Sequence, residues 1–206
     1  PERLDAVLRA LRWPGADDEA LREWRAALAL RAKGFNTAVP VAVGQAATAG
    51  VVTRSFVMTA GIADGVCAHY AVPTFTTAQR RAFARELGEL TRRFHAAGFV
   101  HKDFYLYHVF VTPPASATPG PTLALIDLQR VVRPVLFRER WLVKDLAALA
   151  YSALKIGMPR ADLARFFKVY RGHPRLRESD KLLARKIVKR VRWLNQRQPK
   201  HDGPLN

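Results

Sequence analysis

Apolar residues recur at helical spacing in several stretches of this 206-residue chain, and short β-type runs separate these stretches. The strongest helical pattern begins at Thr76 or Thr77 and ends before Gly98. The other predicted helices cover residues 1–13, the segment from Asp17 or Asp18 to Gly34, and residues 144–154, about 163–170 and about 180–194.

Short runs rich in Val, Ile and aromatic residues predict strands at 39–43, 51–58, 109–111 and 123–126. Residues 113–121 are rich in Pro, Ser, Thr and Gly, and we expect a hairpin or a flexible loop there. Helical and strand segments are grouped along the chain instead of alternating. This order favours an α+β fold over a parallel βαβ fold.

The composition is that of a globular protein with a sizeable core, since 49% of the residues are hydrophobic and 25% are charged. The single cysteine, Cys67, excludes an internal disulfide framework and a CxxC metal site. No apolar run reaches the roughly 18–20 residues that a membrane-spanning helix needs. The first residues also lack the pattern of a secretory signal.

A net charge of +17 predicts attraction to a polyanion, which can be a nucleic acid, an anionic lipid or a phosphorylated glycan. Residues 171–206 hold eleven Lys and Arg against three acids, a net charge of +8. In the last predicted helix, basic residues form a stripe that suits an anionic membrane or glycolipid surface: Lys181, Arg185, Lys189 and Arg192. The alternative is an ordinary solvated helix face.

The segment 98–111 holds the clearest candidate chemistry. It contains His101-Lys102-Asp103, then four residues, then His108 before an apolar run. Protein-kinase catalytic loops have the pattern H-R-D-x-x-x-x-N at this spacing. Asp103 is therefore a candidate base that takes a proton from an acceptor hydroxyl, with Lys102 as a cation near the transferred phosphoryl group. The alternative for Asp103 is that it caps a turn after a helix.

A second acid, Asp127, ends the apolar run at 123–126, where kinases have the metal-binding Asp of D-F-G. Leu128 and Gln129 replace the Phe and Gly of that motif. His108 occupies the place of the kinase metal-binding Asn and is a candidate ligand, although Mg²⁺ prefers oxygen ligands. The alternative for His108 is a structural bond to the backbone or to Asp127.

Two further acids each have two interpretations. Glu23 lies in the second predicted helix, where kinases have a Glu that pairs with the nucleotide-binding Lys. The alternative for Glu23 is that it is a solvated helix residue, and helical spacing alone does not favour Glu23 over Glu19 for this role. Asp145 opens an apolar helix, so it either caps that helix or braces the catalytic loop.

The chain resembles the lipopolysaccharide core kinases, the heptose kinase and Kdo kinase group with a eukaryotic-like kinase fold. The resemblance covers about residues 20–171 and is specific because the motifs occur in order. They are Arg22-Glu23-Trp24, Val39-Pro40-Val41-Ala42-Val43-Gly44, Ser55-Phe56-Val57-Met58-Thr59, Phe94-His95-Ala96-Ala97-Gly98, His101-Lys102-Asp103 through Tyr107-His108, Ile126-Asp127-Leu128-Gln129-Arg130, Arg140-Trp141-Leu142-Val143-Lys144-Asp145-Leu146 and Phe166-Phe167-Lys168-Val169-Tyr170.

The resemblance implies an ATP- and Mg²⁺-dependent kinase that phosphorylates a sugar hydroxyl, on a heptose or Kdo, of the lipopolysaccharide inner core. The implied partners are the lipopolysaccharide core or a lipid A precursor glycolipid and the anionic surface of the inner membrane. Nucleic acid is not expected as a partner. The implied location is cytoplasmic, peripheral to the inner face of the inner membrane of a Gram-negative bacterium.

The resemblance also assigns residue roles. Asp103 is the implied base and Asp127 binds metal, while His108 at the Asn position is typical of the heptose kinase branch. The remaining implied roles are Glu23 as the partner of the nucleotide Lys, Met58 and Thr59 as adenine contacts in a hinge at 56–62, and His101 and Asp145 as structural braces.

The implied fold is protein-kinase-like. A partial small β lobe at 1–59 contains helix C and the following strands, and a mainly helical lobe at 60–206 contains the catalytic loop and the basic C-terminal helix. A Gly-rich phosphate loop and a V-A-x-K strand are missing before Glu23. We therefore expect a fragment whose first strands precede Pro1, and poor ATP binding by this chain.

Two other functions stay open. One is a kinase-fold enzyme that acts on another small molecule or on a protein. The other is a basic pseudokinase, or a module that binds a polyanion or a membrane without turnover, which the charge favours. The pair of acids, Asp103 and Asp127, favours an enzyme.

Overall fold

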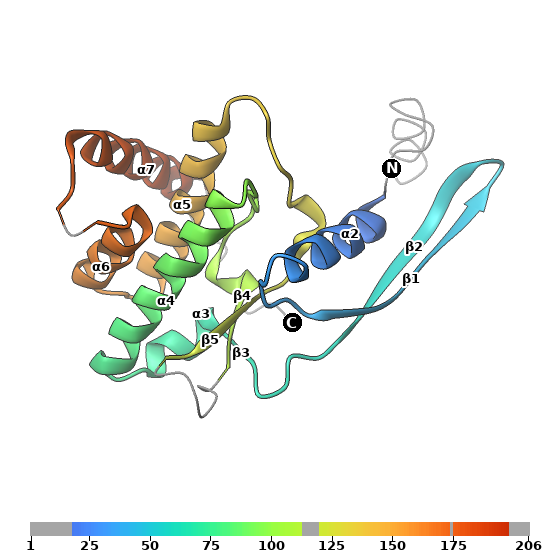
Figure 1. Ribbon diagram of the computed structural model, residues 1–206, viewed down its shortest axis with the longest axis horizontal. Coiled ribbons are helices and arrows are strands. Elements are labelled where there is room, and N and C mark those ends of the chain that lie inside the picture. The colour runs from blue at the N-terminus through green and yellow to red at the C-terminus, as the bar shows by residue number, and fades with distance from the viewer. Residues whose placement is uncertain (1–17, 113–119, 174, 198–206) are drawn as a thin grey trace.

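The computed structural model describes residues 18–112, 120–173 and 175–197 (Figure 1). The helices are α2 (Glu19–Arg31), α3 (Ala68–Ala71), α4 (Thr77–Ala96), α5 (Arg138–Lys155), α6 (Arg160–Arg171) and α7 (Glu178–Arg197), with short 3-10 turns η1 (Val72–Thr74), η2 (Leu106–His108) and η3 (Leu128–Arg130). The strands are β1 (Val39–Thr48), β2 (Val51–Ala60), β3 (Val66–Cys67), β4 (Val109–Thr112) and β5 (Thr122–Leu125). The predicted helix at 1–13 and residues 113–119 of the predicted loop lie outside the described residues.

Local side-chain chemistry sets the helix boundaries that the sequence predicts. Asp18 caps α2 by accepting a hydrogen bond from the Leu21 amide at 2.9 Å. Thr76 and Gln79 form a capping box at the start of α4. Gly98 follows α4 with φ of +90°, a conformation in which an L side chain is strained. These boundaries are confirmed.

The start of α5 differs from the prediction. The helix begins at Arg138, six residues before the predicted start at 144. Its first turn contains Arg138, Glu139 and Arg140, which are all exposed. Hydrophobic periodicity marks only the part of a helix that packs against a core, so this solvated turn gave no signal.

Two antiparallel sheets form the β part of the fold. β1 and β2 pair along a long hairpin, which extends away from the helical body on the right of Figure 1. β3, β4 and β5 form a small three-stranded sheet within the body. The Leu125 amide also donates to the Asn36 carbonyl at 2.9 Å, which joins the segment between α2 and β1 to the small sheet. The fold is therefore α+β, as expected.

A cluster of aromatic rings holds the end of α4 against the loop that follows it. Phe94 is fully buried, and its ring centroid lies 5.8 Å from that of Phe35, 5.7 Å from Phe99 and 5.5 Å from Phe104. Aromatic pairs at these separations add to the stability gained from burial alone. The cluster fixes the loop after α4 relative to both α2 and α4.

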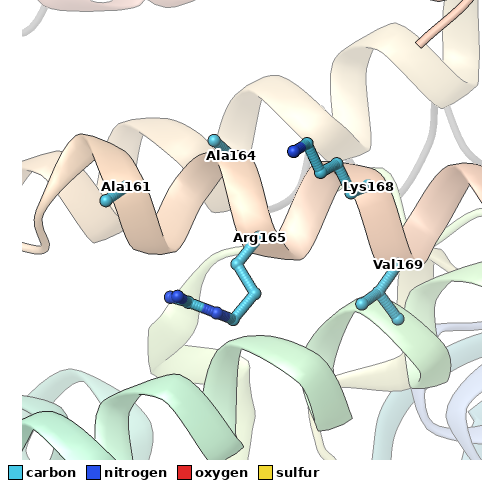
Figure 2. A pocket seen from close by; sticks show the side chains of 5 residues that line it. All are labelled: Ala161, Ala164, Arg165, Lys168 and Val169. Atoms are coloured by element: carbon cyan, nitrogen blue, oxygen red, sulfur yellow. The ribbon is translucent and has the colours of Figure 1, made fainter. Parts of the chain in front are cut away.

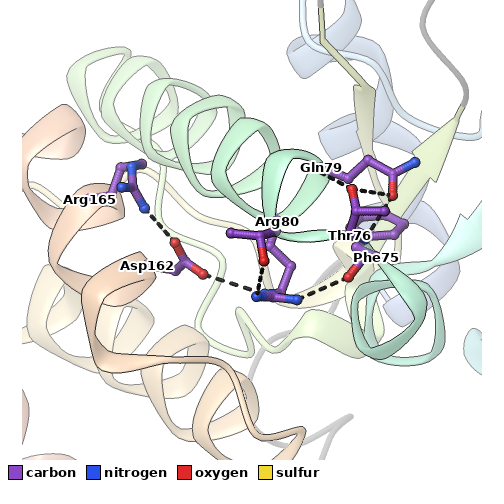
Figure 3. A network of polar contacts seen from close by, with 7 residues as sticks. Phe75, Thr76, Gln79, Arg80, Asp162 and Arg165 are labelled. Carbon is purple, nitrogen blue, oxygen red and sulfur yellow. Dashed lines mark hydrogen bonds and ion pairs between the residues drawn. The ribbon is translucent and has the colours of Figure 1, made fainter.

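The helices α4 and α6 pack closely around Gly88. A Cβ atom on Gly88 would lie 2.8 Å from the Phe166 carbonyl oxygen, so only glycine permits this approach. At one end of the contact, buried Asp162 pairs with Arg165 of α6 and with Arg80 of α4 (Figure 3). Arg80 also donates to the Phe75 carbonyl at 3.0 Å. These ion pairs set how the two helices are aligned.

Candidate active site

The loop between α4 and β4 is anchored by the carboxylate of Asp145. This side chain is fully buried, and it accepts hydrogen bonds from the backbone amides of His101 at 2.7 Å and Lys102 at 2.8 Å. Asp145 is the eighth residue of α5, so the alternative that it caps the helix is wrong. Its contacts are those that a brace between α5 and the loop would make.

A buried histidine and a tyrosine extend this anchor. His95 lies with Nε2 3.2 Å from the Asp145 carboxylate and Nδ1 3.1 Å from the Tyr170 hydroxyl. Burial raises the pKa of Tyr170 to about 12. Sequence reasoning assigned His95 no partners and missed this link between α4, α5 and α6. The only sequence signal for these contacts was that His95 lies next to the apolar face of its predicted helix.

His101 is held in one protonation state by its surroundings. The carbonyl oxygen of Ile126 can only accept, so Nε2 of His101 donates to it, at 3.1 Å. Complete burial lowers the pKa of His101, which favours the neutral ring. The ring stacks between those of Phe104 at 5.2 Å and His108 at 5.7 Å. His101 therefore connects the loop to the end of β5.

His108 joins the two candidate carboxylate segments. Its Nδ1 donates to the Asp103 carbonyl oxygen at 2.7 Å, while its Nε2 faces a carboxylate oxygen of Asp127 at 3.2 Å. Of the two structural bonds that the sequence left open, the one to the backbone is present, and the one to Asp127 requires a proton on Nε2. Because Nδ1 carries a proton, Nε2 faces Asp127 as a lone pair unless a second proton or a cation lies there.

Asp103 is oriented by cations from elements that are distant in the sequence. Its carboxylate lies 2.6 Å from Arg130 of η3 and 3.7 Å from Lys144 of α5. Sequence reasoning assigned no role to Arg130 or Lys144. The available signal was only that each lies within three residues of a candidate acid, Asp127 or Asp145, which does not give the direction of its side chain.

Lys102 has a left-handed backbone conformation, with φ of +70°. Its ammonium group lies 5.0 Å from the centroid of the Trp141 ring, a cation–π contact. Partial burial, and then the cations Arg130 and Lys144, lower the pKa of Lys102. The role of Lys102 near a transferred phosphoryl group stays a prediction.

Asp127 and Glu23 meet where α2 packs on η3. Asp127 has φ of +56° and precedes η3, so its side chain projects from a strained turn. Glu23 is half-buried and accepts a hydrogen bond from the Leu128 amide. Burial raises the pKa of Glu23, and the negative charge of Asp127 raises it further. Glu19 is exposed and pairs with Arg22, so Glu23 is the acid of α2 that faces the site.

The predicted adenine contacts lie apart from this group. Met58 and Thr59 belong to β2, where they pair with Ala42 and Pro40 of β1. Met58 is 54% exposed. None of the contacts described above involves either residue, and their role beside adenine stays a prediction.

The aromatic residues of the loop divide into buried and exposed. Phe104 is fully buried and packs in the hydrophobic core. Tyr107 is partly exposed and stacks on His69, with ring centroids 3.8 Å apart and a hydroxyl contact of 2.8 Å to Nε2. Tyr70 is 60% exposed beside this pair. His69 therefore covers part of the Tyr107 side chain, and the rest is exposed.

An open depression of about 320 Å³ lies on α6 (Figure 2). Its lining residues are Ala161, Ala164, Arg165, Lys168 and Val169. None of them belongs to the loop, to η3 or to α5, so the depression is separate from the carboxylates. Among the described residues, no group of three or more His, Cys, Asp and Glu side chains is placed to hold a metal ion.

Two acids are joined through one histidine, and one of them, Asp103, lies between two cations, which defines an α+β protein with a site suited to phosphate chemistry. The model of the lipopolysaccharide kinase (Kdo/WaaP) family matches residues 3–170, and the chain belongs to this family.

Named relatives agree with this assignment. The chain is 32% identical over 175 residues to the lipopolysaccharide core heptose(I) kinase WaaP of Escherichia coli, and 34% identical over 170 residues to that of Pseudomonas aeruginosa. These matches cover 81% and 77% of this chain but 64% and 61% of the relatives. A solved structure described as WaaP in complex with acyl carrier protein has a TM-score of 0.66 and 28% identity, covering 89% of this chain and 77% of that chain.

Proposed function

We propose that the protein transfers the γ-phosphoryl group of ATP to a sugar hydroxyl of the lipopolysaccharide core, on a fold of the protein-kinase type. One observation supports this most strongly. His108 bonds the Asp103 backbone through one ring nitrogen and faces the Asp127 carboxylate with the other. His108 thereby fixes the positions of Asp103 and Asp127 relative to each other, as a phosphotransferase needs. The named relatives are kinases.

Asp103 would orient the acceptor hydroxyl and accept its proton as the oxygen attacks. In phosphoryl transfer the protein mainly positions reactants and neutralises charge. Lys144 and Arg130 hold the carboxylate on two sides, which fixes its direction. The same cations are placed to balance negative charge that develops on the transferred group.

The residues present fit a divalent cation such as Mg²⁺ held by Asp127 and His108. Mg²⁺ is usually bound through one or two carboxylates together with substrate phosphates and water, so a large protein cluster is not required. The lone pair of His108 Nε2 and the Asp127 oxygen face the same space. When bound, the cation would neutralise phosphate charge. The strained turn at Asp127 keeps its carboxylate directed toward this space.

ATP would lie between the β1–β2 hairpin and the loop. In this arrangement α2 is the helix that supplies Glu23, and the hinge at 56–62 supplies Met58 and Thr59. Glu23 already contacts the Leu128 amide, next to Asp127. Its pairing with a nucleotide-binding Lys, the lobe boundary near residue 59 and the adenine contacts all belong to this proposal.

A heptose is the proposed acceptor, because the curated relatives are named as heptose(I) kinases. Kdo is the alternative. Tyr107 would stack on the acceptor sugar, since it is partly exposed one residue before His108. Replacing Tyr107 by Ala should raise KM for the acceptor more than it lowers kcat, as measured in steady-state assays at saturating ATP.

The proposed partners are the core glycolipid and the anionic inner face of the inner membrane, where a peripheral enzyme would meet it. In the described part of the chain, no helix has the length and apolarity to cross a membrane. Acyl carrier protein is a further candidate partner, because the solved relative is in complex with it. Co-elution of the two purified proteins in size-exclusion chromatography tests that pairing.

The direct test is phosphoryl transfer from ATP to purified core acceptors that end in heptose or in Kdo. We expect Mg²⁺-dependent transfer to the heptose acceptor and loss of transfer in Asp103→Asn. Glu89→Gln is the matched control, because Glu89 is an exposed acid on α4 that pairs with Arg92. Transfer by Asp103→Asn at the wild-type rate would refute the assigned base, and transfer only to Kdo would refute the acceptor.

A further inference from the structure

Three consecutive apolar side chains protrude from the segment that leads from η3 into α5. Val135, Leu136 and Phe137 are 93%, 71% and 79% exposed, and we call these three residues the apolar tip. In Figure 1 the yellow segment before α5 arches away from the body at the top. Leaving this much apolar area in water is unfavourable, and adjacent exposed hydrophobic residues mark interaction surfaces.

The backbone at the tip is strained. Phe137 has φ of +54° and ψ of +34°, the left-handed conformation that suits Gly or Asn. It also occupies the N-cap position of α5, where Ser, Thr, Asp, Asn or Gly would favour the helix. A bulky aromatic residue at such a position is an outlier, and strain of this kind clusters at functional sites. The side chain of Phe137 therefore has a use other than folding.

Cations flank the tip on both sides. Arg133 precedes it and lies over the Phe99 ring at 5.3 Å, while Arg138 follows it and donates to the His95 carbonyl oxygen. Arg140 lies over the Trp141 ring at 5.6 Å. All three arginines are exposed, so they are held against the body and still present charge to solvent.

The basic helix α7 runs beside the same region. Lys186 of α7 forms an ion pair with Glu139, two residues after the tip. Four other basic residues of α7 are also exposed: Lys181, Arg185, Lys189 and Arg192. The chain as a whole has a net charge of +17. An apolar centre surrounded by positive charge complements a surface with anionic phosphates above hydrocarbon.

We propose that the apolar tip inserts into the headgroup region of an anionic lipid bilayer, while the flanking Arg and Lys side chains contact lipid phosphates. Membrane-surface binding of this kind grows with the buried apolar area and with the number of cations near anionic lipids. A protruding apolar tip suits a fluid bilayer better than a protein partner, which would need a groove of matching shape.

The position of the tip gives this contact a consequence for the site. The tip follows η3, and Arg130 of η3 pairs with Asp103. Insertion would hold the segment that follows η3 at the bilayer surface, where a lipid-linked acceptor resides. The role given to membrane binding rests on the proposed function, which it deepens. The binding itself requires neither ATP nor acceptor.

The first test is sedimentation of the full chain with vesicles of phosphatidylcholine alone or with phosphatidylglycerol. We expect binding to the anionic vesicles, and binding at least about tenfold weaker in the variant Val135→Ser/Leu136→Ser/Phe137→Ser. The control is Val41→Ser/Val66→Ser/Leu154→Ser, which removes three exposed apolar side chains from β1, β3 and the far end of α5. This control should bind like the wild type.

A second measurement locates the tip directly. Cys67→Ser/Leu136→Cys carries one thiol, which can hold an environment-sensitive fluorophore. We expect its emission to shift to the blue with anionic vesicles, and no shift when the label is at Val41→Cys in the same background. Circular dichroism should show wild-type folding for every variant, because the replaced apolar residues are exposed and Ser at position 67 can donate to the same carbonyl oxygens as Cys67.

Three results would overturn the proposal. These are equal vesicle binding by the serine tip variant and the wild type, no binding of the wild type to anionic vesicles, or tip-dependent binding to a small acidic protein without binding to vesicles. Transfer to a short water-soluble acceptor should be unchanged in the tip variant. Failure of the proposed function would abolish that transfer in the wild type, so the two failures are distinguishable.

Discussion

Single residues decide whether the loop around Asp103 has a defined shape. The Asp145 carboxylate receives two backbone amides of the loop and also contacts His95. His108 then connects the loop to Asp127. Each of these side chains replaces contacts that water would otherwise make, so the loss of one leaves buried donors without an acceptor.

Replacing Asp145 by Asn should destabilise the protein by about 2–4 kcal/mol. The Asn side chain has one acceptor oxygen, so it cannot accept from both backbone N–H groups of the loop and also contact His95 as the carboxylate does. Urea unfolding followed by circular dichroism measures this change. Asp64→Asn serves as the control, since Asp64 is exposed and Asn tolerates its φ of +54°. Equal unfolding midpoints for the two variants would show that Asp145 does not anchor the loop.

The pKa of Tyr170, raised by burial to about 12, predicts a loss of stability in alkali. The folded state keeps the phenol proton above its ordinary pKa of 10.0, whereas the unfolded state releases it. The stabilising effect is complete below about pH 10 and is lost as the pH rises toward about 12. Between about pH 9 and pH 11, the wild type should lose about 1 kcal/mol more unfolding free energy than Tyr170→Phe.

Urea unfolding at the two pH values gives this difference for both proteins. Other groups titrate in the same range, but they do so in both proteins and cancel in the comparison. A parallel loss in the wild type and in Tyr170→Phe would contradict the assignment to Tyr170.

Sequence reasoning found the candidate acids but not their partners. Asp103 and Asp127 were visible because a motif and a strand end mark them. The choice of Glu23 over Glu19 depends on which side of α2 faces η3, and helical spacing does not give that direction. The contacts of Asp145 and Asp103 join residues 27 to 50 positions apart, and such contacts depend on tertiary packing that no local pattern encodes.

At the scale of secondary-structure elements, the contact between α4 and α6 supports the side chains that anchor the loop. α4 carries His95 and α6 carries Tyr170, whose side chains meet at 3.1 Å. The close approach at Gly88 and the Arg80–Asp162 ion pair determine the alignment that lets them meet. A shift of α6 along α4 would therefore disturb the anchor of the loop.

Gly88→Ala tests this contact. A Gly-to-Ala change inside a helix usually stabilises it by about 1 kcal/mol. Here the added Cβ would lie 2.8 Å from the Phe166 carbonyl and 3.0 Å from Val169, so we expect a net destabilisation of about 1–3 kcal/mol. Thermal unfolding gives the value, and Glu89→Ala, one position on with a partly exposed side chain in a surface ion pair, should change stability by less than about 0.5 kcal/mol. A stabilised Gly88→Ala variant would show that the helices are not in close contact.

Element positions were largely predictable because capping and periodicity are local properties. Asp18, Thr76 and Gly98 marked helix ends correctly. The start of α5 was missed because its first turn is solvated, and β1 continues to Thr48, beyond its predicted end at 43, through Gly, Gln, Ala and Thr residues that give little apolar strand signal. The apolar periodicity of α5 comes from its buried face, so its unburied first turn is not seen from the sequence.

For the whole molecule, the segregated order of helices and strands was enough to give the α+β class. The relation between the hairpin, α2 and the helical body was not, because it depends on a few links such as the Leu125–Asn36 hydrogen bond. The apolar tip at 135–137 was also hidden, since a short hydrophobic run looks the same in sequence whether it is buried or exposed. The positive charge was visible from composition, but its arrangement around the tip required the structure.

The central claim is that Asp103 and Asp127 act together in one phosphoryl-transfer site. It is tested most directly by single-turnover transfer from ATP and Mg²⁺ to the heptose acceptor, in Asp103→Asn, Asp127→Asn and the double variant. Each single change should lower the rate constant by at least about 10³-fold, and the double variant should lose little more, because residues that act as a unit are not additive. If either single variant keeps a rate within about tenfold of the wild type, the account of the site is contradicted.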